Sequence, residues 1–377
     1  MVISGEPQNR NYSLREINIR ANFFKHFELV LVVLGMKNWI GLIAGIAFSA
    51  IFTASSFAQD AHDLIMQGNQ LHGQRKFDEA IAKYNEALKA EPENATANYE
   101  IAYTLYDAKK PEAAIPYLEK VTKSPQMGLV EAAYCLMGSI YDDGHQPQKA
   151  IDAFNAAIKI GPNYPQVFFN LGIAEFRDNR FAEAEQAAIE AMKRAPNNAS
   201  DQRLYALVTF HQDKRGNALL ALCSFLLIEP TGPRAVEAYN NIQSILKGGV
   251  LKQGNGNMTI QASANADKDA STLNTGITLT AASAAGKKLQ GNELLAYDLK
   301  NIFALAGQLA EKKTDKNFFD KFFAAYLYKL AQSDQANTLV EIVAAAANQQ
   351  NAAKWQEDNK AKADALKEWM KNMPREF

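Results

Sequence analysis

Cysteine is scarce in this sequence, because its 377 residues contain only two, Cys135 and Cys223. Two cysteines so far apart do not make a disulfide framework, and we interpret both as small apolar residues of a helical core. An excess of one charge is also missing, since 40 basic residues stand against 41 acidic ones and the formal net charge is −1. The chain lacks the basic footprint of nucleic-acid-binding proteins, so we expect no nucleic-acid partner.

The motifs that hold metals or carry catalysis are missing as well. The four histidines after residue 58, which are His62, His72, His145 and His211, never stand three or four residues apart, the spacing that places two ligands on one face of a helix. No serine lies in a Gly-x-Ser-x-Gly turn, and no glycine-rich loop is followed by the lysine and hydroxyl residue of a phosphate site. We therefore expect no catalytic residue, no metal and no cofactor, and predict that the protein is not an enzyme.

Long apolar runs are rare, and the main one lies near the N-terminus. It follows Lys37, ends at Phe52 and is succeeded by the small residues Ser56 and Ala58. A short basic start, an apolar middle and small residues two apart are typical of a secretory signal. The pattern predicts a signal peptide over 36–58 that is cleaved after Ala58, which would place the mature chain in the periplasm or outside the cell.

We assign residues 1–58 as a targeting segment, although its first part does not fit a signal peptide, whose basic leader is short. Our hypothesis is that translation starts at Met36 rather than at Met1. An alternative keeps residues 39–57 as an uncleaved anchor, because this stretch is just long enough to cross a hydrocarbon core. Contact with a membrane is expected only in that case.

The most informative pattern is an internal repeat. Prolines recur at intervals of 33, 37, 34 and 34 residues, at Pro92, Pro125, Pro162, Pro196 and Pro230. Counting back from them gives five units, which are residues 61–94, 95–128, 131–164, 165–198 and 199–232. Self-similarity at this period is the signature of a protein built from stacked helix pairs.

Two positions in each unit are always small. Position twenty is alanine in all five units, as Ala80, Ala114, Ala150, Ala184 and Ala218. Position eight is glycine or alanine, as Gly68, Ala102, Gly138, Gly172 and Ala206. Two helices approach closely only where side chains are small, so these positions predict the crossing of each pair. A bulky residue four positions after the alanine completes the contact; unit four has Ala188 there, and we expect Phe181 to fill its place.

This pattern resembles the tetratricopeptide repeat family over residues 61 to 232. The resemblance implies an all-α fold in which paired helices form a right-handed α-solenoid and the first helix of each pair lines the inner face. Residues 233–247 have helical spacing and are predicted to cap the stack, so that the solenoid spans 61–247. A glycine-rich segment, 248–268, is predicted to be a linker with a loop or hinge.

Residues 269–377 have helical periodicity without the repeat and are predicted to form a separate C-terminal helical region. Its segment Asn317 to Leu330 carries six aromatic residues and is interpreted as a core helix. A two-part protein, whose C-terminal helices bind a ligand or carry an activity, is an alternative that a deep polar pocket with convergent ionisable groups would favour.

The resemblance places certain positions of each first helix on the inner face. The predicted partner-binding groove consists of Tyr99, Tyr103, Tyr106, Asp142, Phe169, Asn170, Ile173, Phe176, Arg177, Arg203, Phe210 and His211. Rings with a few polar groups suit a groove that binds a polypeptide. Of the positions that clasp a C-terminal carboxylate in related repeats only Asn69 conforms, so an extended or helical segment is expected instead.

These features predict a non-catalytic scaffold of the cell envelope that binds a protein or peptide partner in the concave face of the solenoid. The alternatives are a membrane-anchored subunit of an envelope complex and the two-part protein described above.

Overall fold

The computed structural model describes residues 60–247, 250–252, 258–260 and 268–377. The predicted signal peptide and the alternative anchor lie outside the described residues. The chain divides into two units with the boundary after Thr104. Within the described part of the chain, no helix combines the length and the apolar character needed to span a membrane.

The first unit contains the first predicted helix pair. A helix over residues 60–73 is followed by α3 (Phe77–Ala90), and α4 (Ala95–Asp107) begins before the boundary. A Cβ atom on Gly68 would lie 2.3 Å from the ring of Tyr84 on α3, so the two helices meet at their small residue.

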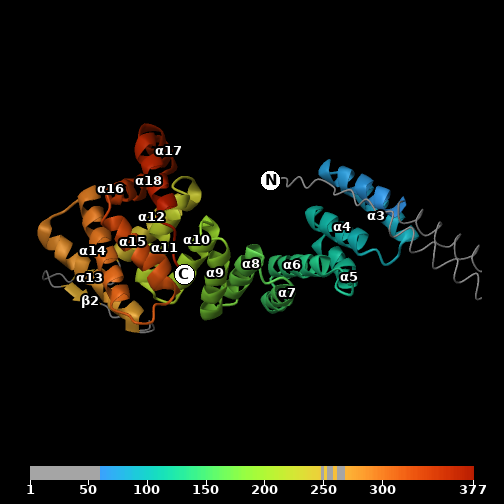
Figure 1. Ribbon diagram of the computed structural model, residues 1–377, viewed down its shortest axis with the longest axis horizontal. Helices are drawn as coiled ribbons and strands as arrows, with labels where there is room; N and C mark the ends of the chain where they lie inside the picture. The colour runs from blue at the N-terminus through green and yellow to red at the C-terminus, as the bar shows by residue number, and fades with distance from the viewer. Residues whose placement is uncertain (1–59, 248–249, 253–257, 261–267) are drawn as a thin grey trace, which may run out of the picture. The chain divides into compact units, whose positions relative to one another are not determined.

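The second unit continues the helix pairs and is α-helical throughout its repeats (Figure 1). Its helices are α5 (Pro111–Val121), α6 (Met127–Asp143), α7 (Pro147–Ile160), α8 (Pro165–Arg177), α9 (Phe181–Arg194), α10 (Ala199–His211) and α11 (Arg215–Ile228). The helices α6 and α7, α8 and α9, and α10 and α11 pack as pairs, and each pair packs on the next. The fold is the tandem-repeat α-solenoid that the sequence predicts.

Packing at the crossings explains the repeated small residues. The alanine at position twenty is fully buried in all five units. A Cβ atom on Gly138 would lie 2.5 Å from the ring of Phe154, so the small residue at position eight is confirmed as a contact point. In unit four, the side chain next to Gly172 is Leu204 of the following unit, whose Cδ2 would be 2.9 Å from an added Cβ. A neighbouring side chain therefore supplies the bulk at this crossing, and at Gly172 that side chain is Leu204 of the following repeat.

Each turn between paired helices contains one residue in the left-handed region. These residues are Arg75, Lys109, His145, Asn179 and Asp213, with φ between 54° and 62°. In each turn the following residue donates its backbone N–H to a carbonyl five residues earlier, as from Gln146 to Tyr141 at 2.8 Å. Such a bond closes a helix C-terminus in the Schellman arrangement. All five turns therefore reverse the chain by the same backbone geometry.

Helix α11 is buried on every side. All its residues from Gly216 to Leu227 are buried, although a surface helix buries only one stripe. The reason is that α13 (Lys268–Lys287) and α14 (Gly291–Glu311) cover the side of α11 that faces away from the repeats. Leu273 of α13 lies against Gly216, where an added Cβ would meet its Cγ at 2.3 Å.

The C-terminal region is helical, as the sequence predicts. After α14 it contains the π-helix η1 (Asp320–Ala325), α15 (Tyr326–Ala331), α16 (Ala336–Ala345), α17 (Gln349–Asp358) and α18 (Lys360–Asn372). Phe322, Phe323 and Tyr326 are buried, which confirms the aromatic segment as a core helix. One hydrophobic core extends from Ala184 to Leu366 and so joins this region to the last repeats.

Two differences from the sequence prediction follow. Helix α12 (Pro233–Lys247) does not close the stack by itself, because the C-terminal helices also cover α11.

In the linker, β1 (Val250–Lys252) and β2 (Met258–Ile260) pair as antiparallel strands, with Leu251 opposite Thr259. A short hairpin therefore stands where we expected only a loop.

Candidate functional site

The predicted groove residues of the first unit form an aromatic stack. Tyr99 and Tyr103 lie one helical turn apart on α4, with parallel rings whose centroids are 6.4 Å apart. The ring of His72 stacks on Tyr103 at 5.4 Å, and its Nδ1 lies 2.9 Å from the hydroxyl of Thr104. Tyr103 keeps 40% of its surface exposed, so a large ring remains available for contact.

Asn69 is the one residue that fits the pattern by which related repeats clasp a C-terminal carboxylate, and its side chain is already hydrogen-bonded within the repeat. The hydroxyl of Tyr84 donates a hydrogen bond of 2.8 Å to the side-chain oxygen of Asn69. Burial and the nearby Glu100 raise the pKa of Tyr84 to about 12, so this hydroxyl stays protonated. Asn69 is thus held by the repeat's own core tyrosine.

In the second unit, α8 presents five predicted groove residues, the last of which is Arg177. Phe169, Asn170, Ile173 and Phe176 are all half-buried. The three apolar side chains pack on the hydrophobic core on one side and keep part of their surface in solvent. These residues therefore contribute both to the stack and to the exposed face.

Polar side chains on successive first helices, α4, α6 and α8, contact one another. The guanidinium of Arg177 forms an ion pair with Asp142 of α6. The hydroxyl of Tyr106 donates a hydrogen bond of 2.8 Å to Asp143. The first contact joins two predicted groove residues of successive repeats, and the second joins Tyr106 to the residue next to Asp142.

Helix α10 carries the last three predicted groove residues, Arg203, Phe210 and His211, and Arg203 and His211 contact different neighbouring helices. The ring of His211 lies 4.8 Å from that of Phe176 in an edge-to-face arrangement, and Phe210 next to it is 38% exposed. Arg203 instead points to α12, where both oxygens of Glu237 accept hydrogen bonds of 2.8 and 2.6 Å. The structure thus brings His211 and Phe176 together and engages Arg203 with the solenoid itself.

Two aromatic members of this face were absent from the predicted set. Phe181 lies 5.6 Å from Phe176 and 5.4 Å from His211. His72 occupies position twelve of its unit, the position that gives Tyr106, Phe176 and Phe210 in other units. The repeat numbering alone could have identified His72, whereas Phe181 begins a second helix and follows no such rule.

A buried carboxylate lies beneath the same face. Glu175 of α8 is buried, and its Oε2 has no hydrogen-bond partner. Burial and the nearby Glu183 raise its pKa to about 7, against a smaller effect of Arg180. No group of three or more histidine, cysteine or acidic residues in the described part of the chain could hold a metal ion.

These helix pairs, with their small crossing residues and uniform turns, have the form that the sequence resemblance implies. The sequence model of that family, described as tetratricopeptide repeat, matches residues 65–127 and 135–199. The helix pairs within these residues are therefore tetratricopeptide repeats. A comparison with curated proteins finds no match.

Several solved structures are similar to this chain. A crystal structure of the MamA protein has 23% sequence identity and a TM-score of 0.42, and the match covers 46% of this chain and 93% of that one. The protein YrrB, described as a TPR protein with an unusual peptide-binding site, has 20% identity and a TM-score of 0.43, with coverage of 50% and 97%. PilF of Pseudomonas aeruginosa has 15% identity and a TM-score of 0.40, with coverage of 50% and 90%.

Proposed function

We propose that this protein is a non-catalytic scaffold that binds a polypeptide partner along the first helices of its repeats. The observation that carries the proposal is the exposure of the predicted groove residues, none of which is buried. Tyr103 and Phe210 keep about two fifths of their surface in solvent. Large rings with few rotamers contribute much of the affinity of protein interfaces.

We further propose that the scaffold acts in the cell envelope, as a periplasmic or secreted protein. The support is the signal-like pattern that ends at Ala58. The mass of the native protein and its distribution between membrane and soluble fractions test this proposal. A chain that begins near Gln59 supports export with cleavage, whereas a native chain that retains residues 39–57 and sediments with membranes supports the anchored subunit.

Binding is tested by replacing one groove ring. A photo-crosslinking residue at position 103 captures the partner, whose affinity is then measured for the wild type and for Tyr103→Ala. Tyr164→Ala is the matched control, because Tyr164 is 53% exposed and lies just before α8 rather than on the groove.

We expect Tyr103→Ala to weaken the complex by about 1–2 kcal/mol and the control to leave it unchanged. Equal affinity of Tyr103→Ala and wild type for the captured partner would contradict the groove. The thermal midpoint of both variants should remain near that of the wild type, because neither side chain is buried.

A further inference from the structure

A cavity lies where the last repeats meet the C-terminal helices. This junction cavity has a volume of about 650 Å³, within the range of roughly 300–1,000 Å³ that is usual for small-molecule sites. Its lining comes from α9, α10, the start of α11, the start of α13, the end of α14 and the residues before η1. It is therefore a product of the docking of the C-terminal region onto the last repeats.

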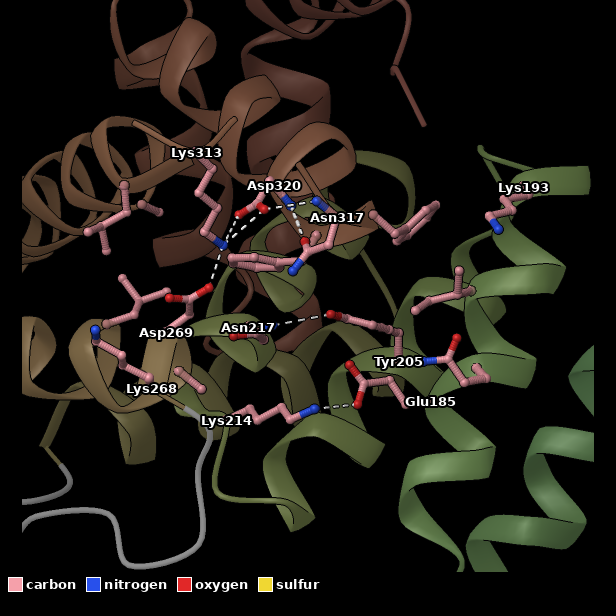
Figure 2. A pocket seen from close by; sticks show the side chains of 18 residues that line it. Glu185, Lys193, Tyr205, Lys214, Asn217, Lys268, Asp269, Lys313, Asn317 and Asp320 are labelled. Carbon is pink, nitrogen blue, oxygen red and sulfur yellow. Dashed lines mark hydrogen bonds and ion pairs between the residues drawn. The ribbon is translucent and has the colours of Figure 1, made fainter. Parts of the chain in front are cut away.

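Ion pairs occupy two opposite sides of the junction cavity (Figure 2). On one side Lys313 lies 2.6 Å from Asp269 and 2.8 Å from Asp320. On the other side Lys214 lies 2.6 Å from Glu185. Every carboxylate of the lining is thus already paired with a lysine of the lining.

The remaining charges leave the site close to neutral. The lining has four lysines and three carboxylates, and its Lys193 pairs at 2.7 Å with Glu190 just outside it. At each ion-paired side of the cavity, a charged ligand would be attracted by one member of the ion pair and repelled by the other. A neutral ligand meets no such opposition.

Hydrogen-bonding groups alternate around this neutral cavity. Between the two ion-paired sides lie the buried Tyr205 and Asn217, whose amide donates to the Tyr205 hydroxyl at 3.3 Å (Figure 2). Asn317 borders the cavity beside Asp320. A ligand hydroxyl can donate to a carboxylate and accept from an ammonium or amide at once, so hydroxyl groups suit the polar parts of this lining.

Two half-buried rings add an apolar wall. Phe318 and Phe319 precede η1 and line the cavity together with Leu273 and Leu309. The C–H face of a sugar ring is apolar and can pack on such a surface, while its hydroxyls reach the polar sides. Binding pockets commonly combine aromatic walls with a few placed polar groups.

We propose that the junction cavity binds a small neutral saccharide. Its hydroxyls hydrogen-bond to the Lys214–Glu185 pair, to Tyr205 and to the Lys313 group, and its ring packs on the phenylalanines before η1. The site is independent of the groove and of any polypeptide partner.

The test uses the full mature chain and saturation-transfer NMR with glucose, N-acetylglucosamine, cellobiose and, as charged analogues, glucose 6-phosphate and glucosamine. Tyr205→Phe removes one hydroxyl and keeps the ring, which stacks at 5.1 Å on Phe323. Glu185→Gln keeps the shape of the side chain and removes its charge. Tyr297→Phe is the matched control, because its hydroxyl bonds to Ser283 outside the cavity.

We expect at least one neutral saccharide to bind more tightly than both charged analogues, and its affinity to fall about tenfold in Tyr205→Phe and in Glu185→Gln. The control should bind as the wild type does. Absence of binding by every neutral saccharide overturns the proposal, as does tighter binding of a charged analogue. Binding that is equal in wild type and both cavity variants overturns it too, provided that their thermal midpoints match.

Discussion

The guanidinium carbon of Arg375 lies 3.9 Å from the centroid of the Tyr326 ring. The same group donates hydrogen bonds to the backbone oxygen of Phe322 at 3.0 Å and to the hydroxyl of Ser224 on α11 at 2.5 Å. Burial lowers the pKa of Arg375 to about 10, against a smaller opposing effect of Tyr326. The end of the chain is thereby fastened to the π-helix and to the last repeat.

Arg375→Met should destabilise the protein. The change keeps an apolar stem of similar length but removes the two hydrogen bonds and the contact of the cation with the ring. The free energy of unfolding should therefore fall by about 1–3 kcal/mol. Urea unfolding followed by circular dichroism measures it. Lys371→Met, at an exposed position of α18, serves as the control and should leave the midpoint nearly unchanged. Equal midpoints for the two variants would contradict the role of Arg375.

Gly138→Ala should be costly although alanine favours helices. The added methyl would overlap the ring of Phe154, and overpacking of this kind costs about 1–3 kcal/mol. Gly128→Ala on the same helix is the comparison, because nothing lies within 4 Å of its added Cβ; it should stabilise by about 0.5–1 kcal/mol. Opposite signs of the two changes in thermal midpoint support the crossing contact, and a stabilising Gly138→Ala would refute it.

His145→Gly should stabilise the protein. His145 has φ of 54°, a conformation that costs a residue with a Cβ atom roughly 1 kcal/mol and that glycine adopts freely. The greater freedom of glycine in the unfolded chain offsets part of this gain. The free energy of unfolding, measured by chemical denaturation, should rise by up to about 0.5–1 kcal/mol. His145→Val should lower it, because a β-branched residue is strained at positive φ.

Asp201→Asn should make the protein more stable at pH 8. Asp201 is 1% exposed, neither of its carboxylate oxygens has a hydrogen-bond partner, and burial raises its pKa to about 7. The usual pKa in an unfolded chain is about 3.9, so the folded state binds the extra proton between these values. Stability from this group is complete below about pH 4 and is lost as the pH rises through about 7.

Thermal unfolding of the wild type and Asp201→Asn across this pH range checks the expectation. The variant should lose less stability between pH 5 and pH 8, because an uncharged amide takes the place of the carboxylate. Asp334→Asn, at an exposed position, should not flatten the dependence. A steeper loss in Asp201→Asn than in the wild type would contradict the assignment.

The sequence predicted the repeats because their physics is local. The small residue at position eight meets a ring only sixteen positions later, Tyr84 beside Gly68 and Phe154 beside Gly138, so a single period in the sequence contains the whole contact. The left-handed conformation of the turn residues was not predicted, although position fifteen is polar in every unit and one of the five residues is asparagine. Their common backbone geometry requires φ angles that residue type alone does not specify.

The candidate sites divide in the same way. The proposed groove was predicted from the repeat numbering, and its predicted members are exposed or half-buried in the structure. The junction cavity could not be predicted, because Glu185, Lys214, Asp269 and Lys313 are separated by up to 128 residues and meet only after the C-terminal helices dock. One signal of that docking was present, since α11 is apolar on all faces and so requires cover on both sides.

The complete burial of α11 also limits how the protein can evolve or assemble. A further repeat cannot be appended after α11, and the repeats of a second molecule cannot stack there, because α13 and α14 already occupy that surface. Duplication of units is compatible with the fold only upstream of this helix. The C-terminal helices therefore act as a terminator that fixes where the array ends.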